Sequence, residues 1–527
     1  MKKRSRIICL VLALMLLIGI LSACSPSANN NPPASGSPGT SQPSSSPAAP
    51  AGRTNINLSV NSVEGTTDYM LLNNLVGRLM VYNVYDALYH VDDFGGLHPR
   101  IAKSYTIGDD DRTYTFNLRD DVYFHNDEKL KASDVIFTID RLYSMPYFDM
   151  HTAHIDSYKA IDDYTVEIVS KTPLAMFMYS ISLFKIMSEK AVREGGDDLF
   201  LTAETSRAGC GPYYYTEFNP DSVIKLEAFP KYYRGEASIK SITYKYIPDP
   251  TTALVAFEAG EIDFVSLPVA NVAEMQQTGK YNVILNPSSH ISYIAFNINK
   301  EPFNNKLVRQ ALGYAINKEE ILLGAYNNYG DIAVGSLARE GFMFGGINEG
   351  IPTYTYDPVK AKELLTQAGY PDGFDAGTII ALGNMYFKRG AEIIQQSFAD
   401  VGVTVRVEGL ESSALSEQLF INQTFDVAYH GDPATIDSDN VYNQFYSPDN
   451  AMTMKGFNPR IIELCNLGKV TVDPEQRKEI YKEFWAIAME EANFIPTFHR
   501  ANPYIANNDL NVEMGTTFFF IYDFSWK

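Results

Sequence analysis

The chain has 527 residues, of which 43 are Lys or Arg and 63 are Asp or Glu, so its formal net charge is −20. This acidity argues against nucleic acid and anionic lipid headgroups as partners, because both would be repelled. The length is too great for a single hydrophobic core and predicts two or three lobes.

The first segment of the chain has the pattern of a processing signal. Basic residues at positions 2, 3, 4 and 6 precede an apolar run over residues 7–21, which is short for a membrane-spanning helix. The run ends in Leu21-Ser22-Ala23-Cys24, which resembles a bacterial lipoprotein box. The resemblance implies that residues 1–23 are a signal peptide and that Cys24 becomes a lipidated N-terminus.

Residues 25–52 are rich in Ser, Pro, Ala, Gly and Asn and contain no charged or large apolar side chain. Such a segment cannot bury enough apolar surface to offset its ordering entropy, so we expect a disordered linker over residues 24–52. Removing the basic residues of the signal leaves 39 basic against 63 acidic residues, a net charge of −24. That charge also mildly favours cationic or zwitterionic ligands.

The remaining chain alternates helical and strand patterns, as α/β proteins do. Apolar residues recur at helical spacing over 391–401, Gly402 ends the helix, and residues 403–408 alternate as a half-buried strand. Asp357 and Asp473 each precede a proline, which predicts two capped helix starts. Residues 113–118 predict a strand, and Ser133 is expected to cap the helix that follows.

Familiar catalytic motifs are missing. The sequence has no phosphate-binding loop, zinc-binding His-Glu-x-x-His helix or Gly-x-Ser-x-Gly elbow. Ser182-x-x-Lys185 and Ser438-Asp439-Asn440 match two elements of penicillin-binding enzymes, but the third, Lys-Thr-Gly, is absent. These observations predict a binding protein without enzymatic activity.

Metal-binding patterns are equally incomplete. His151 and His154 have no further ligand nearby, and Asp432, Asp437 and Asp439 lack the turn and terminal Glu of a calcium loop. We therefore expect no metal or other cofactor. Only two cysteines, Cys210 and Cys465, fall in the folded part; the sequence does not decide whether they pair, but free buried thiols are favoured.

A series of segments, in this order, resembles the family 5 extracellular solute-binding proteins, which are the dipeptide and oligopeptide receptors of ABC importers. The segments include Val84-Tyr85-Asp86-Ala87-Leu88 and Gly209-Cys210-Gly211-Pro212-Tyr213, together with residues 97–105, 112–119, 122–125, 132–135, 257–263, 295–299, 302–303, 308–311, 356–358 and 369–371. They span nearly the whole mature chain. Most of these residues predict local structure, and the glycines beside Cys210 suit a tight backbone bend.

The resemblance implies a two-lobed α/β fold of the type II periplasmic-binding-protein class, with an extra subdomain in the first lobe. Lobe I would comprise residues 53–88, 205–293 and 499–527, its extra subdomain residues 89–204, and lobe II residues 294–498. Paired crossing strands near 292–297 and 495–499 would form the hinge. We expect a monomer, lipid-anchored at the extracellular face of the cytoplasmic membrane, that delivers its ligand to an ABC permease and ATPase.

The same resemblance implies that an Asp just after a strand of lobe II accepts the ammonium group of a peptide ligand. Residues 425–432 predict that strand and the turn after it, so Asp432 is the first candidate and Asp437 the second, with Tyr429 and Asp439 as further candidates. The sequence departs from the family in three places. Tyr429 stands where peptide receptors usually have Trp, Cys210 stands where they usually have Thr, and no Arg is evident for the ligand carboxylate.

Lys388 and Arg389 lie near that place but at an expected helix start, where surface positions are favoured. An oligosaccharide, a nickel chelate or haem are alternative ligands, because the family carries all of them on one fold. A hydrolase that uses the carboxylates between Asp432 and Asp439 is the alternative from a different class.

Overall fold

The computed structural model describes residues 52–72, 75–341, 346–432, 437–441, 446, 458–515 and 519–527. The predicted signal peptide, Cys24 and almost all of the predicted linker lie outside these residues. Residues 51–527 form one compact unit. Its mixed sheets and flanking helices confirm the predicted two-lobed α/β fold.

One mixed sheet runs through both lobes of this unit. Its strand order is β15-β14-β16-β12-β17-β11-β1-β10-β9-β8, and β13 pairs with β17 off this path. The strands are β1 (Asn55–Val60), β8 (Tyr213–Asn219), β9 (Val223–Ala228), β10 (Ser241–Tyr246), β11 (Phe264–Ser266), β12 (Tyr281–Phe296), β13 (Gly330–Ile332), β14 (Phe374–Leu382), β15 (Val403–Leu410), β16 (Val427–Asp432) and β17 (Phe494–Asn507).

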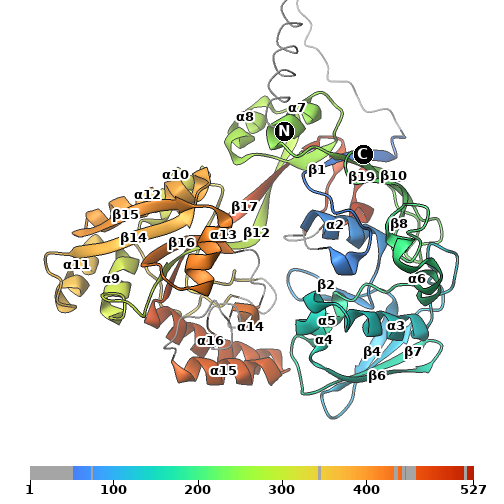
Figure 1. The fold of residues 1–527 in the computed structure, drawn as a ribbon, viewed down its shortest axis with the longest axis horizontal. Helices are drawn as coiled ribbons and strands as arrows, with labels where there is room; N and C mark the ends of the chain where they lie inside the picture. The colour runs from blue at the N-terminus through green and yellow to red at the C-terminus, as the bar shows by residue number, and fades with distance from the viewer. Residues whose placement is uncertain are drawn as a thin grey trace, which may run out of the picture. The chain divides into compact units, whose positions relative to one another are not determined.

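The long strands β12 and β17 connect the two lobes (Figure 1). They pair antiparallel from Tyr281 opposite Asn507 to Ala295 opposite Phe494, and the register is irregular between Pro287 and Ile291. The predicted crossing segments pair with each other, since Ser292 lies opposite Phe498 and Ile294 opposite Ile495. The hinge of crossing strands is thus confirmed, and the strands extend beyond the predicted segments.

A second sheet, with the order β4-β5-β7-β6, belongs to lobe I. Its strands are β4 (Ala102–Ile107), β5 (Thr113–Leu118), β6 (Ile155–Asp162) and β7 (Thr165–Ser170), so the strand predicted at 113–118 is confirmed. Nearby elements are α2 (Leu75–Val84), β2 (Tyr89–Val91), β3 (Leu97–Pro99), α3 (Ala132–Leu142), α4 (Asp149–Thr152), α5 (Phe177–Ser182) and α6 (Glu189–Gly195).

The predicted cap of α3 is wrong. The helix begins at Ala132, so Ser133 already lies in its first turn. The carboxylate of Asp134 accepts a hydrogen bond from the backbone N–H of Lys131 at 2.9 Å, and the start of the helix is closed in this way. A carboxylate three residues inside the helix can reach back to the cap position, which the sequence pattern at Ser133 concealed.

Two further helices begin at the predicted caps. Asp357 precedes α11 (Pro358–Gln367) and Asp473 precedes α16 (Pro474–Glu491), and each carboxylate accepts a backbone N–H of the first turn. The predicted helix and strand around Gly402 are α12 (Met385–Ala399) and β15. The remaining elements are α7 (Pro250–Glu258), α8 (Val272–Thr278), α9 (Lys306–Ala315), α10 (Lys318–Tyr326), α13 (Ser412–Ser416), α14 (Ser438–Val441), α15 (Pro459–Val470), β18 (Leu510–Asn511) and β19 (Ser525–Trp526).

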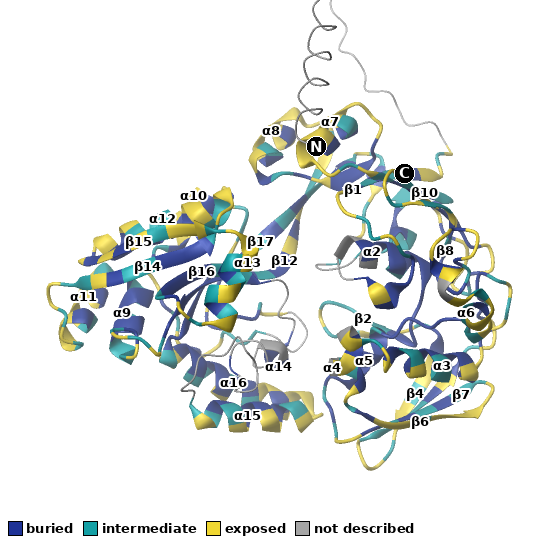
Figure 2. Cartoon of the chain, in the orientation of Figure 1, coloured by how far each residue is buried: buried dark blue, intermediate teal, exposed yellow. Residues whose placement is uncertain are grey.

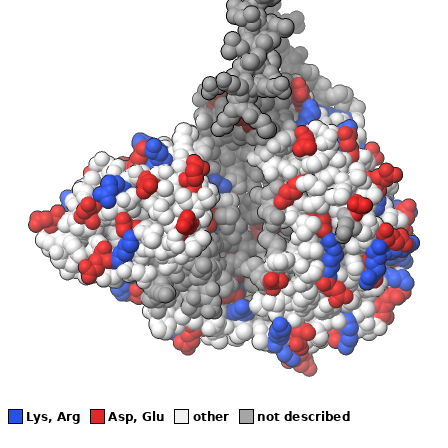
Figure 3. Space-filling view, viewed as in Figure 1, with Lys and Arg blue, Asp and Glu red and all other residues white. Residues whose placement is uncertain are grey.

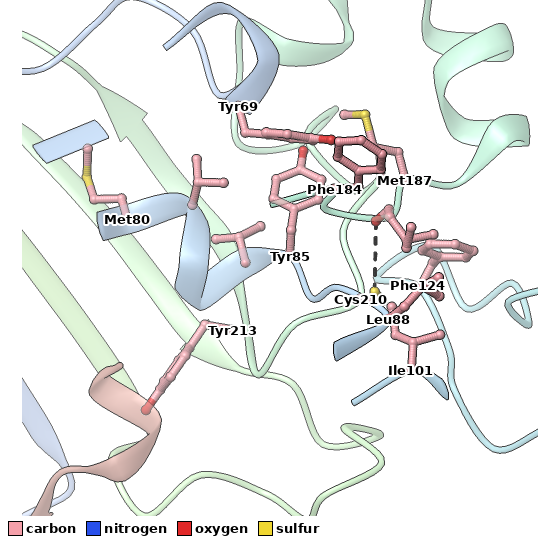
Figure 4. Packing of buried hydrophobic residues seen from close by; sticks show 14 of the residues in the cluster. Tyr69, Met80, Tyr85, Leu88, Ile101, Phe124, Phe184, Met187, Cys210 and Tyr213 are labelled. Atoms are coloured by element: carbon pink, nitrogen blue, oxygen red, sulfur yellow. Dashed lines mark hydrogen bonds between the residues drawn. The ribbon is translucent and has the colours of Figure 1, made fainter. Parts of the chain in front are cut away.

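Each lobe has its own core. In lobe I a large cluster surrounds Tyr85, Phe124 and Cys210, whose thiol donates to the carbonyl oxygen of Ile186 at 3.9 Å (Figure 4). Lobe II buries apolar side chains on both faces of its part of the sheet. One cluster contains Ile294 and Tyr429 and the other contains Tyr293. Figure 2 shows the strands β14 and β16 largely buried and the outer faces of helices such as α15 exposed.

Basic and acidic side chains are interspersed on the face of the molecule shown in Figure 3. None of the helices in the described ranges is both long and apolar enough to cross a membrane.

The glycines beside Cys210 are required by a close backbone approach. The amide of Gly211 donates to the carbonyl oxygen of Val84 at 2.8 Å, and the carbonyl oxygen of Gly209 accepts from the amide of His125 at the same distance. A Cβ atom on Gly209 would lie 2.3 Å from the carbonyl oxygen of Val84. The predicted tight bend is therefore a packing of this segment against the end of α2.

Replacing Gly209 by Ala should lower the free energy of unfolding by about 1–3 kcal/mol, because the new methyl group overlaps a backbone oxygen that cannot move freely. Urea denaturation followed by circular dichroism measures the change. Gly65→Ala is the matched control, since a Cβ atom there meets no atom within 4 Å. Equal stabilities for the two variants would contradict this account of Gly209.

Candidate functional site

Asp432 is the last residue of β16, which lies between β14 and β12. Its register partner on β12 is Ile291. The residue is only 7% exposed, and its carboxylate accepts a hydrogen bond from the hydroxyl of Tyr293 at 2.6 Å. The predicted strand is therefore present, but it continues through Asp432, which was expected in the turn after it, and Tyr293 is a neighbour that the sequence did not reveal.

His430 is a second polar neighbour of Asp432. Its Nε2 lies 3.8 Å from Oδ1 of Asp432. Burial lowers the pKa of His430, and the nearby Asp432 charge opposes this only in part, so the imidazole is neutral at pH 7. No Lys or Arg among the described residues forms an ion pair with Asp432. Its carboxylate therefore has a hydroxyl and a neutral imidazole beside it, and it can accept a cation.

Asp437 and Asp439 belong to a separate, buried group. Arg477 of α16 donates to both carboxylate oxygens of Asp437, at 2.9 and 3.0 Å. Asp439 accepts from the hydroxyl of Tyr481 at 2.5 Å, and burial followed by the charge of Asp437 raises its pKa. Asp437 is fully buried and Arg477 is 2% exposed. These two carboxylates have partners inside the protein. Their contacts with Arg477 and Tyr481 hold α14 against α16.

The ring of Tyr429 lies on the opposite face of β16 from Asp432, in keeping with strand alternation. It is buried against α12, where a Cβ atom on Gly390 would come within 2.3 Å of the ring. Tyr429 also lines a cavity of about 130 Å³ together with residues of β12, β17 and α12. The candidates therefore fall into three places: Asp432, the cavity beside Tyr429, and the group around Arg477.

The remaining predicted positions can be placed simply. Lys388 and Arg389 lie in the first turn and a half of α12, where Arg389 is exposed and pairs with Glu392 at 3.3 Å. His151 is close to the hydroxyl of Ser180, at 3.3 Å. In the described part of the chain no three His, Cys, Asp or Glu side chains are arranged to hold a metal ion.

Both cysteines of the folded part are free, as favoured by the sequence. Cys210 belongs to the core of lobe I and Cys465 to that of lobe II. Lobe I also contains an apolar cavity of about 250 Å³, lined by residues that include Val60, Phe264 and Tyr504.

Comparison with known proteins identifies the family. The family described as bacterial extracellular solute-binding proteins, family 5, matches residues 96–453. The chain is 28% identical over 436 residues to heme-binding protein A of Haemophilus influenzae, an alignment that covers 76% of this chain and 79% of that protein. It is also 28% identical over 436 residues to the dipeptide-binding protein of Escherichia coli, with 75% and 79% covered.

A solved structure gives the same result for the fold. The periplasmic binding protein DppA of Helicobacter pylori, in complex with the peptide STSA, superposes with a TM-score of 0.71 at 24% identity. The alignment covers 90% of this chain and 98% of that one. The chain therefore belongs to the family 5 bacterial extracellular solute-binding proteins, and it is a substrate-binding protein of the ABC importer family, not an enzyme.

Proposed function

We propose that this receptor binds an extended oligopeptide and that Asp432 accepts the ammonium group at the N-terminus of the peptide. The observation that carries the proposal is the buried carboxylate of Asp432, which among the described side chains has the hydroxyl of Tyr293 and a neutral His430 beside it. A buried charge without a counter-charge is costly, and an incoming ammonium group would supply that counter-charge.

The other carboxylates are less suited to this role. Asp437 is already paired with Arg477, and Asp439 with Tyr481. A ligand cation could reach either one only by displacing a buried partner, which would leave Arg477 or Tyr481 unsatisfied. The same internal pairing argues against the hydrolase alternative, because it leaves neither Asp437 nor Asp439 available as a second carboxylate beside Asp432.

Relatives of this chain include a dipeptide-binding protein and a structure that holds the peptide STSA, which supports a peptide ligand. Heme-binding protein A is as similar in sequence as the dipeptide-binding protein is, so haem stays an alternative ligand. Members of this family pass their ligands to an ABC permease and its ATPase subunits.

We further propose that the receptor is a monomer anchored at the extracellular face of the membrane through a lipid on Cys24. The sequence Leu21-Ser22-Ala23-Cys24 supports this, and the residues concerned lie outside the described part of the chain. A linker over residues 24–52 would let the folded body stand clear of the bilayer.

The ligand class can be read directly. Mass spectrometry of the small molecules released by denaturing the purified receptor should detect peptides. Haem, a nickel chelate or an oligosaccharide in stoichiometric amount would contradict the peptide proposal and identify the class of ligand.

The role of Asp432 can be tested by substitution. Asp432→Asn should weaken binding of a peptide with a free N-terminus by roughly 2–5 kcal/mol, because the ligand ammonium loses its buried counter-charge. An N-acetylated peptide should bind the wild type poorly and lose much less on substitution. Calorimetric titration of both peptides against both proteins completes the cycle. Equal losses for the two peptides would mean that Asp432 acts on structure alone.

Asp437→Asn is the matched comparison for that experiment. It should lower the free energy of unfolding by about 3–5 kcal/mol, because the buried Arg477 loses the carboxylate that accepts two of its hydrogen bonds and keeps Asp439 at a longer distance of 3.6 Å. Thermal or urea denaturation measures the loss. If Asp437→Asn is stable but fails to bind peptide, the ammonium site lies at Asp437 instead.

The anchor has its own test. Cys24→Ala should release the receptor from cell membranes into the soluble fraction, while its melting temperature stays that of the wild type. The resemblance to a lipoprotein box implies a diacylglyceryl group on Cys24, and its two acyl chains would supply the stable attachment that a single chain cannot. A variant that remains with the membrane fraction would refute lipid anchoring at Cys24.

A further inference from the structure

The cavity beside Tyr429 contains an arginine without an acidic partner. We call it the Arg500 pocket; it is lined by residues that include His290, Ser292, Tyr326, Asn384, Tyr429 and Arg500. Arg500 lies on β17 on the same face as Phe498, which also lines the pocket. Among the ion pairs that the described residues form, none includes Arg500, and its Nε is buried without a hydrogen-bond partner.

The neighbours of Arg500 cannot neutralise it. Burial, followed by the charge of Arg500, lowers the pKa of His290 to about 3, so this imidazole is neutral. Burial raises the pKa values of Tyr326 and Tyr504, whose hydroxyl groups therefore stay protonated at pH 7. Asp331 follows Gly330, the residue of β13 that pairs with Arg500, but its carboxylate is already paired with Arg339. Among the residues that line this pocket, Arg500 therefore supplies the positive charge.

The pocket also holds neutral hydrogen-bond donors. The side-chain oxygen of Asn384 caps α12 by accepting from the backbone N–H of Phe387 at 3.1 Å, which leaves its amide N–H groups for a ligand. A guanidinium beside amide and hydroxyl donors suits a carboxylate, which accepts two parallel hydrogen bonds from Arg.

The Arg500 pocket and Asp432 lie on opposite faces of the end of β16. Tyr429 and Gly431 line the pocket, whereas Asp432 meets Tyr293 on the other face. Gly431 lies between the two. A Cβ atom there would come within 3.0 Å of Phe387 and 3.1 Å of the carbonyl oxygen of Ile291, so the site has no room for a side chain. Asp432 follows Gly431 directly in the chain, so the proposed ammonium site and the pocket are next to each other along β16.

We infer, resting on the proposed function, that the Arg500 pocket binds a carboxylate of the peptide whose ammonium group binds Asp432. The carboxylate comes either from an acidic side chain next to the N-terminus or from the C-terminus of a short peptide. The receptor would then select ligands that carry both charges close together, and Arg500 would be its second charged contact.

Calorimetric titration distinguishes the two sources. The probes are Glu-Ala-Ala against Gln-Ala-Ala for the side chain, and Ala-Ala against amidated Ala-Ala for the C-terminus. In at least one pair the wild type should prefer the peptide with the carboxylate. Arg500→Gln should lower the affinity for that peptide by roughly 30-fold or more and the affinity for its neutral counterpart only slightly. Arg500→Lys should recover part of the preference, because it keeps the charge without the fork of donors.

Arg389→Gln is the matched control, since this arginine lies on the adjacent helix but is exposed and pairs with Glu392. It should leave all affinities unchanged, and melting temperatures check that every variant is folded. A wild type that binds peptides but shows no preference in either pair would overturn the inference and leave the proposed function standing. The inference would also be overturned, with the proposed function left standing, if Arg500→Gln lowered the affinity equally for the two peptides of each pair. A wild type that binds no peptide would overturn the proposed function and the inference together.

Discussion

The antiparallel pairing of β12 with β17 is the constraint on which the rest of this molecule depends. These two strands lie at the centre of the large sheet, with the lobe II strands added to β12 through β16 and the lobe I strands added to β17 through β11. Successive side chains of a strand point to opposite faces of the sheet. A shift of the pairing by one residue would therefore move every side chain of that strand to the other face. The pairing register therefore decides which polar groups meet Asp432 and which line the Arg500 pocket.

Buried charges in this protein usually have a partner within the chain. Arg477 is held by Asp437, and the guanidinium of Arg309 donates to the backbone carbonyl oxygens of Phe303 and Glu491. Asp263 accepts from the side chains of Arg53 and Asn507. The buried Asp432 and the half-buried Arg500 differ, because no Lys, Arg, Asp or Glu among the described residues forms an ion pair with either of them, whereas Arg309 also has Glu491 at 3.5 Å. The contrast matters because fixed internal pairs stabilise the fold, whereas a charge left facing neutral groups is available to a ligand.

Local features of the fold could be predicted from sequence. The caps at Asp357 and Asp473 act within one helical turn, and the turn between α12 and β15, where Gly402 has a φ of +90°, is equally local. The prediction at Ser133 failed because Asp134, one residue further on, closes the helix instead. Both outcomes depend only on residues that are close in sequence.

The candidate site depends on long-range pairing, and this is where prediction from sequence stopped. Strand β16 was predicted, but the contact of Asp432 with Tyr293 joins residues on different strands. The partner of Asp437 lies forty positions away on α16. The position of Arg500 in a cavity follows from strand register, although one signal was present: it is the single Lys or Arg within the strand Phe494–Asn507.

The two free thiols have a consequence for the redox behaviour of the receptor. Cys210 and Cys465 are each 1% exposed and lie in the separate cores of the two lobes. Burial raises the pKa of both thiols, so almost no thiolate is present to react with oxidants or disulfides. The folded body thus needs no oxidation step to acquire its structure and is inert to thiol exchange outside the cell. Each lobe also carries one chemical reporter of its own opening, since a thiol reagent can reach its cysteine only when that core unfolds.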